Sequence, residues 1–139
     1  MGNSNFETGK LGEHICATKL MKMGETCEIV NLDCVDIIVN RGEQGLVRLQ
    51  VKSSRYKRKD NKQLTKGYQF FTAFGLHKKP LTIEQCDAIG FVALDIEKVI
   101  FAPVSIVGIQ KTKRFSRAKF NEENIELNTW ATTLEGIYQ

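Results

Sequence analysis

The sequence predicts one domain of the α/β or α+β class that mixes helices and strands. An amphipathic helical segment comes first, three apolar segments typical of strands follow, and two more such segments lie further along the chain. The 139 residues are enough for one domain with a proper core. The 42% hydrophobic content and the absence of low-complexity tracts indicate a folded chain.

The first segment, residues 6–23, is predicted to be a helix. Leu11, Ile15 and Leu20 recur at spacings typical of one helix face, and Gly24 supplies a stop signal. Residues 26–31 are predicted to form a short strand after that stop.

A β-hairpin is predicted next. Its strands, residues 34–40 and 46–53, are rich in Val, Ile and Leu, as expected for strands buried on both faces of a sheet. The polar segment 41–45 contains two glycines and has the length that joins neighbouring antiparallel strands.

The middle of the chain gives weaker signals. Residues 54–67 are polar and basic and are predicted to form a loop. Residues 68–74 are rich in aromatic side chains and are predicted to be extended. Residues 80–86 begin with a proline and are predicted to form a short helix.

A second hairpin is predicted towards the C-terminus. Residues 87–94 and 99–104 are apolar, and the polar residues 95–98 make the turn between them. A last short helix is predicted over residues 129–137, with Asn128 as its N-cap.

Several classes of function find no support in the sequence. No run approaches the roughly 20 apolar residues of a membrane span, and the N-terminus lacks a signal-peptide pattern, so we expect a cytoplasmic protein with no membrane partner. The 4 cysteines show neither a Cys-x-x-Cys pair nor metal-finger spacing and are expected to be inert thiols. No Gly-rich phosphate loop or Ser/His/Asp order occurs, so no nucleotide cofactor or acyl transfer is expected.

Positive charge is concentrated in two runs. Residues 52–67 carry seven basic side chains against one acid, and residues 111–119 carry five with none, although the whole chain carries only +4. A single run of this kind is usually a solvated loop. Two runs in a chain that is otherwise acidic favour a surface that binds a polyanion such as nucleic acid.

The residues that suggest chemistry lie in and before the first hairpin. Asp36 lies in its first strand, Gln50 and Lys52 in its second, and Glu13 on the helix that precedes both. Because strand side chains alternate between faces, Gln50 and Lys52 point to the same side of the sheet. A carboxylate, an amide oxygen and an ammonium group can therefore meet at one end of the hairpin, as phosphodiester hydrolysis requires.

This pattern resembles the core of the PD-(D/E)XK nuclease superfamily, over about residues 10–54. The chain is most similar to the small homing-endonuclease and Holliday-junction-resolvase-like members. Within these, the string Gln-Val-Lys-Ser-Ser at 50–54 is closer to the homing type, which tolerates Gln there, than to resolvases with Glu-Val-Lys. The resemblance implies a restriction-endonuclease-like α/β core of order α-β-β-β-α-β, with a central mixed sheet and an added β-hairpin. It implies a single nuclease domain over residues 1–139, with a core at about 7–104 and a basic C-terminal extension at about 105–139.

The resemblance also implies a role for each residue of the pattern. Asp36 would be the essential carboxylate ligand of Mg²⁺, or of Mn²⁺ as a substitute. Gln50 and the backbone carbonyl of Val51 would complete the ligand shell, and Glu13 would be an outer or second-metal ligand. Lys52 would orient or activate the attacking water. Oxygen ligands of this kind suit Mg²⁺, which keeps several waters of its own.

The chain departs from the motif at two positions. Gln50 replaces the usual Asp or Glu, which should weaken metal affinity and disfavour a two-metal site, and Val35 replaces the usual Pro. Asp33 competes with Asp36 for the carboxylate role, and a lone Asp near a strand end is often a cap. Three functions therefore remain open: site-specific double-strand cleavage of the homing type, structure-specific cleavage of Holliday junctions, and DNA binding without catalysis.

Duplex DNA is the expected partner, bound by a homodimer or larger homo-oligomer because one small site per chain must cut two strands. Gln69 would read adenine if its strand enters a groove, although the aromatic residues around it are also suited to a core. The residues expected to contact DNA are Ser53, Ser54, Arg55, Tyr56, Lys57, Arg58, Lys59, Lys62, Lys66, Gln69, Lys111, Lys113, Arg114 and Arg117.

Overall fold

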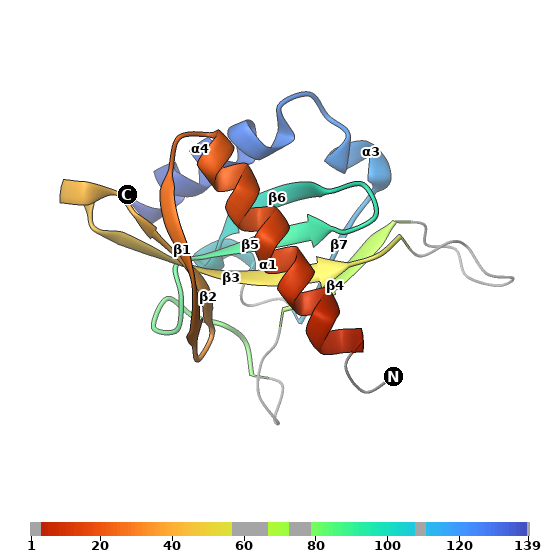
Figure 1. Cartoon of the computed structure of the whole chain (residues 1–139), viewed down its shortest axis with the longest axis horizontal. Coiled ribbons are helices and arrows are strands. Elements are labelled where there is room, and N and C mark those ends of the chain that lie inside the picture. The colour runs from red at the N-terminus through yellow and green to blue at the C-terminus, as the bar shows by residue number, and fades with distance from the viewer. Residues whose placement is uncertain (1–3, 57–66, 73–78, 108–110, 139) are drawn as a thin grey trace, which may run out of the picture.

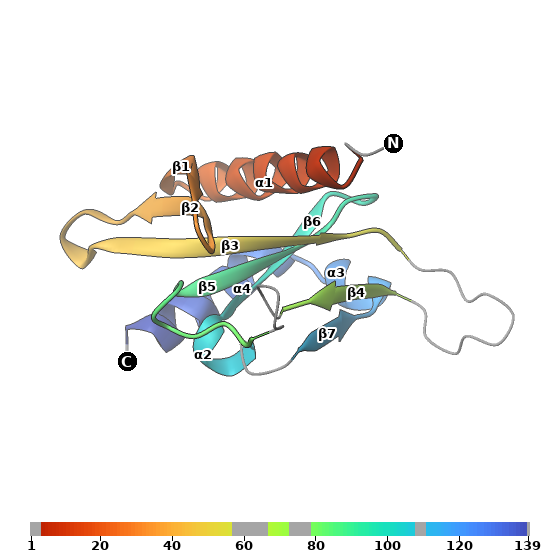
Figure 2. The same cartoon turned by 90° about the horizontal axis from the view of Figure 1, so that it is seen from below.

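A central sheet forms the middle layer of the protein, with other elements on both of its faces (Figures 1 and 2). The computed structural model describes residues 4–56, 67–72, 79–107 and 111–138. Five strands lie in the order β1-β2-β3-β5-β6. β3 and β5 are parallel and the other neighbours are antiparallel. The expected mixed sheet is confirmed. The strands are β1 (Thr26–Leu32), β2 (Val35–Asn40), β3 (Leu46–Ser54), β5 (Ala88–Ala93) and β6 (Lys98–Pro103).

Helix α1 (Ser4–Lys22) runs along one face of this sheet (Figure 2). It ends where the sequence predicts, because Gly24 adopts a positive φ of 92° and the NH of Glu25 bonds to the carbonyl of Leu20. Helix α4 (Ile125–Ile137) covers the same face next to β6 and buries Trp130 against Phe101.

The opposite face is covered by a second, two-stranded sheet and two short helices. This sheet pairs β4 (Tyr68–Phe71) with β7 (Thr112–Phe115), and the helices are α2 (Val104–Val107) and α3 (Arg117–Phe120). Aromatic side chains from these elements pack on β5, whose six residues are all buried. β5 is therefore enclosed on both faces. The expectation of two-sided burial for β2 and β3 is wrong, because β2 alternates between buried and half-buried residues and five of the nine residues of β3 are half-buried.

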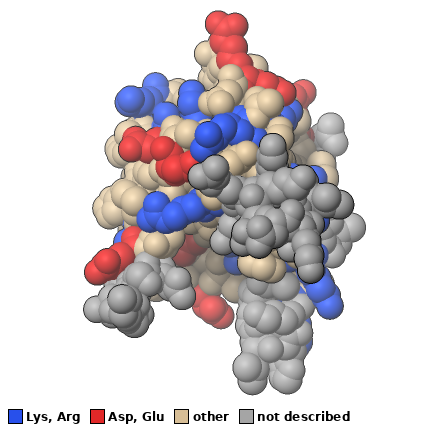
Figure 3. Space-filling view, turned by 90° about the vertical axis from the view of Figure 1, so that its right-hand side faces the viewer, with Lys and Arg blue, Asp and Glu red and all other residues tan. Residues whose placement is uncertain are grey.

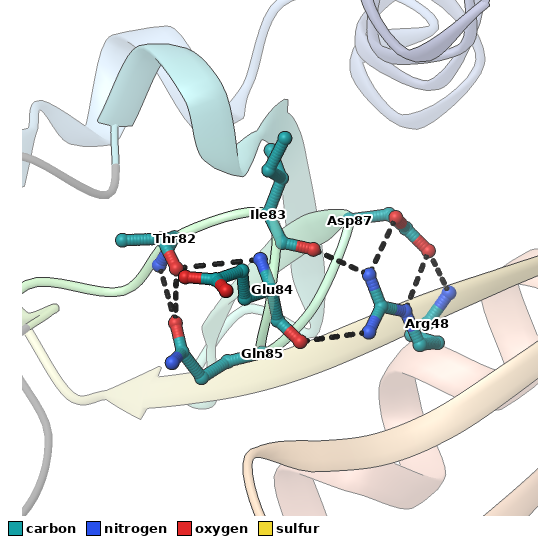
Figure 4. Close-up of polar contacts among 6 residues, drawn as sticks. All are labelled: Arg48, Thr82, Ile83, Glu84, Gln85 and Asp87. Atoms are coloured by element: carbon teal, nitrogen blue, oxygen red, sulfur yellow. Dashed lines mark hydrogen bonds and ion pairs between the residues drawn. The ribbon is translucent and has the colours of Figure 1, made fainter.

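The helix predicted over residues 80–86 is absent, and a turn replaces it (Figure 4). Arg48 of β3 explains the difference, because its guanidinium donates to the carbonyls of Ile83 and Glu84 at 2.6 and 3.0 Å and also pairs with Asp87. These two carbonyls therefore accept hydrogen bonds from Arg48 and not from the backbone NH groups of a helix. The expected order α-β-β-β-α-β has a helix between its third and fourth strands. The described residues between β3 and β5 include no helix.

The C-terminal elements also differ from expectation. Helix α4 begins at Ile125, one turn before the predicted start, and Asn124 rather than Asn128 is its N-cap. Ile125 is buried in the core, and this apolar contact explains why the helix starts one turn earlier than predicted. β7 and α3 lie in the basic stretch 111–119 that was predicted only as a charged run. None of the described helices has the length and apolar character needed to cross a bilayer.

Candidate active site

Asp36 lies at the point where β2 separates from β3. The pairing of these strands ends at Ile37 and Leu49, whereas β3 continues to Ser54 paired only with β5. The Asp36 carboxylate accepts a hydrogen bond from the backbone NH of Val51 at 2.8 Å. Because the NH and CO of one residue face the same edge of a strand, the Val51 carbonyl faces this open edge as well.

The pKa of the Asp36 carboxyl group depends on its surroundings, which include Lys52 and Gln50 of the sequence pattern. Burial raises the pKa of its carboxyl group, and the Val51 NH, Lys52, Lys10 and the Gln50 amide, in decreasing order, oppose that rise. The pKa remains raised overall because desolvation outweighs these contacts. Lys52 and Gln50 therefore both lie close enough to act on Asp36. Asp33, the competing carboxylate, is exposed.

Glu13 reaches Asp36 from helix α1. Burial raises the pKa of Glu13 first, and the neighbouring Asp36 carboxylate raises it further by charge repulsion and by a hydrogen bond. Lys10, one turn earlier on the helix, lies 3.9 Å from Glu13 and opposes the rise. A pair of carboxylates that disfavour each other's charge is an arrangement that a bound cation relieves.

The close approach of α1 to β3 depends on glycine. A β-carbon at Gly12 would collide with the Ser53 hydroxyl, and one at Gly90 would lie 2.9 Å from the sulfur of Cys16. Both glycines allow the helix to lie directly on the parallel strands. Gly12 precedes Glu13, so this packing also fixes the position of the second carboxylate.

Three buried side-chain oxygens at this end of the sheet lack a hydrogen-bond partner among the described residues: Glu13 Oε1, Gln50 Oε1 and Ser53 Oγ. An unsatisfied buried oxygen costs about 1–3 kcal/mol. Glu13 and Gln50 both border Asp36. Their oxygens, the Asp36 carboxylate and the Val51 carbonyl form a set of hard donors that fits Mg²⁺.

This donor set has only two carboxylates. In the part of the chain that the structure describes, no three His, Cys, Asp or Glu side chains form a group that could hold a metal. The four cysteines are unpaired, and burial is the first cause that raises the pKa of each, reaching about 12 for Cys86. Protonated thiols are poor metal ligands.

An open cleft of about 440 Å³ begins at Lys52 and continues towards β4. Its lining combines residues from α1, from the end of β3 and from β4. Both Lys52 and Gln69 contribute, so the candidate catalytic lysine and the candidate base-reading residue share one cavity. The lining residues are Thr8, Lys52, Ser53, Ser54, Arg55, Gln69 and Phe71.

The other residues expected to contact DNA have different surroundings. Lys111 and Arg114 are exposed, while the ammonium group of Lys113 lies 5.4 Å from the ring centre of Phe115. Arg117 is held by Asp95 at 2.7 Å and stacks over the ring of Tyr56 at 4.1 Å. The expected contacts that lie outside the described residues are Lys57, Arg58, Lys59, Lys62 and Lys66.

Sequence reasoning did not include three residues that the structure places near this end of the sheet. Lys10 has the three-residue spacing from Glu13 that pairs side chains on a helix, so its position was accessible from the sequence. Thr8 carries no such signal. Phe71 lies in the aromatic stretch 68–74, which suits both a DNA-facing strand and a core, and alternation within β4 separates it from buried Tyr68 and Phe70.

The arrangement of the whole chain is similar to that of a solved bacterial homing endonuclease, I-Ssp6803I. The TM-score is 0.69 at 18% sequence identity, and the match covers 98% of this chain and 97% of the other. Neither the family models nor the curated protein sequences match this chain. The expected fold class is confirmed: the chain has an α/β, restriction-endonuclease-like fold with a central mixed sheet.

Proposed function

We propose that this protein is a Mg²⁺-dependent DNA endonuclease that hydrolyses phosphodiester bonds. The observation that carries the proposal is the meeting of Glu13, Asp36, Gln50 and Lys52 at the open edge of β3. The similarity of fold to a homing endonuclease supports it. Site-specific cleavage of both strands, of the homing type, is the form we favour.

Asp36, Gln50, the Val51 carbonyl and Glu13 would hold the ion in this proposal. When bound, Mg²⁺ would act as a Lewis acid on the phosphate and increase the acidity of water. Mn²⁺ would substitute for it, since both ions accept oxygen ligands. Gln50 contributes no charge, so tight binding of a second ion is not expected.

Lys52 would act on the reacting phosphate with its ammonium group. Two observations support this role: Lys52 acts on the Asp36 carboxyl group and lines the cleft, so a phosphate bound in the cleft would lie near its positive charge. The charge would orient the attacking water and stabilise the transition state by a few kcal/mol. Arg55, which is exposed further along the cleft, would contact the DNA backbone. Ser54, although expected to do the same, is buried.

The decisive test is cleavage by Asp36→Asn and Lys52→Ala. Each should reduce cutting of plasmid DNA in Mg²⁺ by at least about 100-fold, because each removes a group that acts on the transition state. DNA binding should change little. Gel assays of cleavage and mobility-shift assays of binding measure the two effects, with Lys22→Ala at the far end of α1 as a basic control.

The choice of substrate separates the remaining functions. Linear duplex and a four-way junction, offered at equal concentration, distinguish a homing-type enzyme from a Holliday junction resolvase. Salt-sensitive binding of every substrate without cleavage in Mg²⁺ or Mn²⁺ would indicate a DNA-binding module and contradict the enzyme. Cleavage that survives in Asp36→Asn would contradict the site.

A further inference from the structure

The small sheet of β4 and β7 has one face fixed to the core. Tyr68 and Phe70 of β4 are buried, and their rings contact Phe120 and Phe91 with centres 5.0 Å apart in each pair. The short ribbon is therefore held rigidly against the central sheet by its aromatic face. A rigid support is what precise recognition of another molecule needs.

The opposite face of the ribbon points away from the core. Gln69 lies directly across from Arg114, and Phe71 across from Thr112, so these four side chains share one face. Phe71 is 67% exposed and Arg114 is also exposed. We call these four residues the ribbon face. A single exposed Phe is unremarkable on a protein surface, but here it lies among donors and acceptors for hydrogen bonds.

The ribbon face adjoins the candidate active site. Gln69 and Phe71 line the same cleft as Lys52 and Arg55. In Figures 1 and 2 the C-terminal end of β3, the start of α1 and the two ribbon strands lie at the same end of the molecule. Figure 3 faces this end and shows Lys and Arg above and to the left of the grey atoms, with Asp and Glu between and around them.

We infer that the ribbon face enters the major groove of duplex DNA and reads base edges beside the phosphate that Lys52 approaches. This inference rests on the proposed nuclease function. Two strands about 5 Å apart fit a groove about 12 Å wide, which admits a two-stranded ribbon. The positive charge of Arg114 and Arg55 suits the strongly negative groove.

The side chains of the ribbon face match the chemistry of the groove. A glutamine amide both donates to and accepts from adenine, an arginine guanidinium donates twice to guanine, and an apolar ring contacts the methyl group of thymine. Gln69, Arg114 and Phe71 supply one of each. Because Gln69 and Arg114 are opposite each other, they would contact neighbouring base pairs.

The test is selection of bound duplexes from a pool with randomised sequence, in EDTA so that no DNA is cut. Wild-type protein should enrich particular bases. In both Arg114→Ala and Arg114→Lys, the enrichment at one base pair should fall by about 5- to 100-fold. Lysine keeps the positive charge but cannot donate two parallel hydrogen bonds to guanine. Gln69→Ala should lose an adjacent base pair. Lys22→Ala serves as the matched basic control and should keep the full pattern.

Two results would overturn the inference. One is enrichment by wild type that all three ribbon variants preserve, with affinity reduced equally for every sequence, because this indicates contacts to phosphates alone. The other is no enrichment by wild type. Cutting of a mixed-sequence plasmid in Mg²⁺, measured on the same preparations, tests the nuclease separately: cutting with unchanged base preference would reject the reading role and leave the enzyme intact.

Discussion

Glu13 and Asp36 are in electrostatic conflict, because two carboxyl groups of like charge lie beside each other. Both carboxyl groups have raised pKa values, with burial as the first cause for each. Among the described residues, one buried oxygen of Glu13 and one of Gln50 accept no hydrogen bond, which adds a further cost. Folded chains accept such costs mainly at sites where the polar groups have a task, and the position of this conflict beside an open strand edge supports a catalytic one.

Replacing Glu13 by Gln should make the protein more stable at neutral pH. A raised pKa means that the folded state holds the proton more tightly than the unfolded state. The free energy of unfolding therefore falls as pH rises from below the unfolded pKa through the folded pKa, and it stays lower above it. Glu13→Gln removes this loss, so its advantage should be present at pH 7 and disappear near pH 4, the region of an ordinary Glu pKa.

Urea unfolding of both proteins between pH 4 and pH 7 measures this difference. Glu123→Gln, a change at an exposed glutamate, is the control and should leave stability unchanged. A stability gain that is equal at all pH values, or a loss at pH 7, would contradict the role assigned to the Glu13 carboxylate. Cleavage activity should fall in Glu13→Gln, because this ligand loses its negative charge.

The sequence alone placed three of the four central residues together. The hairpin pattern brings Asp36 to the level of Gln50, and alternation along β3 puts Lys52 on the same face as Gln50. Glu13 required a resemblance, because nothing local in the sequence says how a helix crosses a sheet. The crossing is set by Gly12 and Gly90, whose importance appears only when their neighbours are known.

Helix α1 should tolerate a methyl group at one of its glycines and not at the other. Gly12→Ala would force the helix away from Ser53 and should lower the free energy of unfolding by about 1–3 kcal/mol. It should also reduce cleavage, because Glu13 moves with the helix. Gly9→Ala has open space around its new methyl group and should raise stability by roughly 0.5–1 kcal/mol.

Ser53→Ala removes the hydroxyl that the new methyl group would meet. Combined with Gly12→Ala, it should recover part of the lost stability, so the two changes should be non-additive by at least about 0.5 kcal/mol. Thermal and urea unfolding of the four proteins give this coupling. Additive effects, or a stable and fully active Gly12→Ala protein, would show that close packing of α1 on β3 is not required.

Helices and strands were predictable from the sequence where the hydrophobic pattern is clear and the packing partner is close in sequence. Helix α1 and the strands of both hairpins have clear periodicity and neighbouring partners, and they lie within a few residues of their predicted bounds. The turn at 82–85 depends on Arg48, more than 30 residues away in sequence. β7 pairs with β4 across an even longer interval, so its basic sequence gives no indication that it is a strand.

At the scale of the whole molecule, the described residues form one candidate site at one end of the sheet, whereas a duplex has two strands to cut. A monomer with a single site would nick one strand and must rebind to cut the other. A symmetric dimer would place one site against each strand, and its two-fold axis would match that of a palindromic target. Cleavage of both strands in one binding event therefore requires an oligomer of at least two chains.

Mixing wild-type protein with Asp36→Asn tests this requirement. If the functional unit is a dimer whose chains exchange freely, an equal mixture contains about half mixed dimers, and each of these can cut only one strand. Nicked circular plasmid should then accumulate in the mixture and persist, while wild type alone yields linear DNA. Wild type mixed with Lys22→Ala should give linear product as wild type does. If the Asp36→Asn mixture behaves like half the amount of wild type, with no added nicked product, the two cuts are made by independent chains.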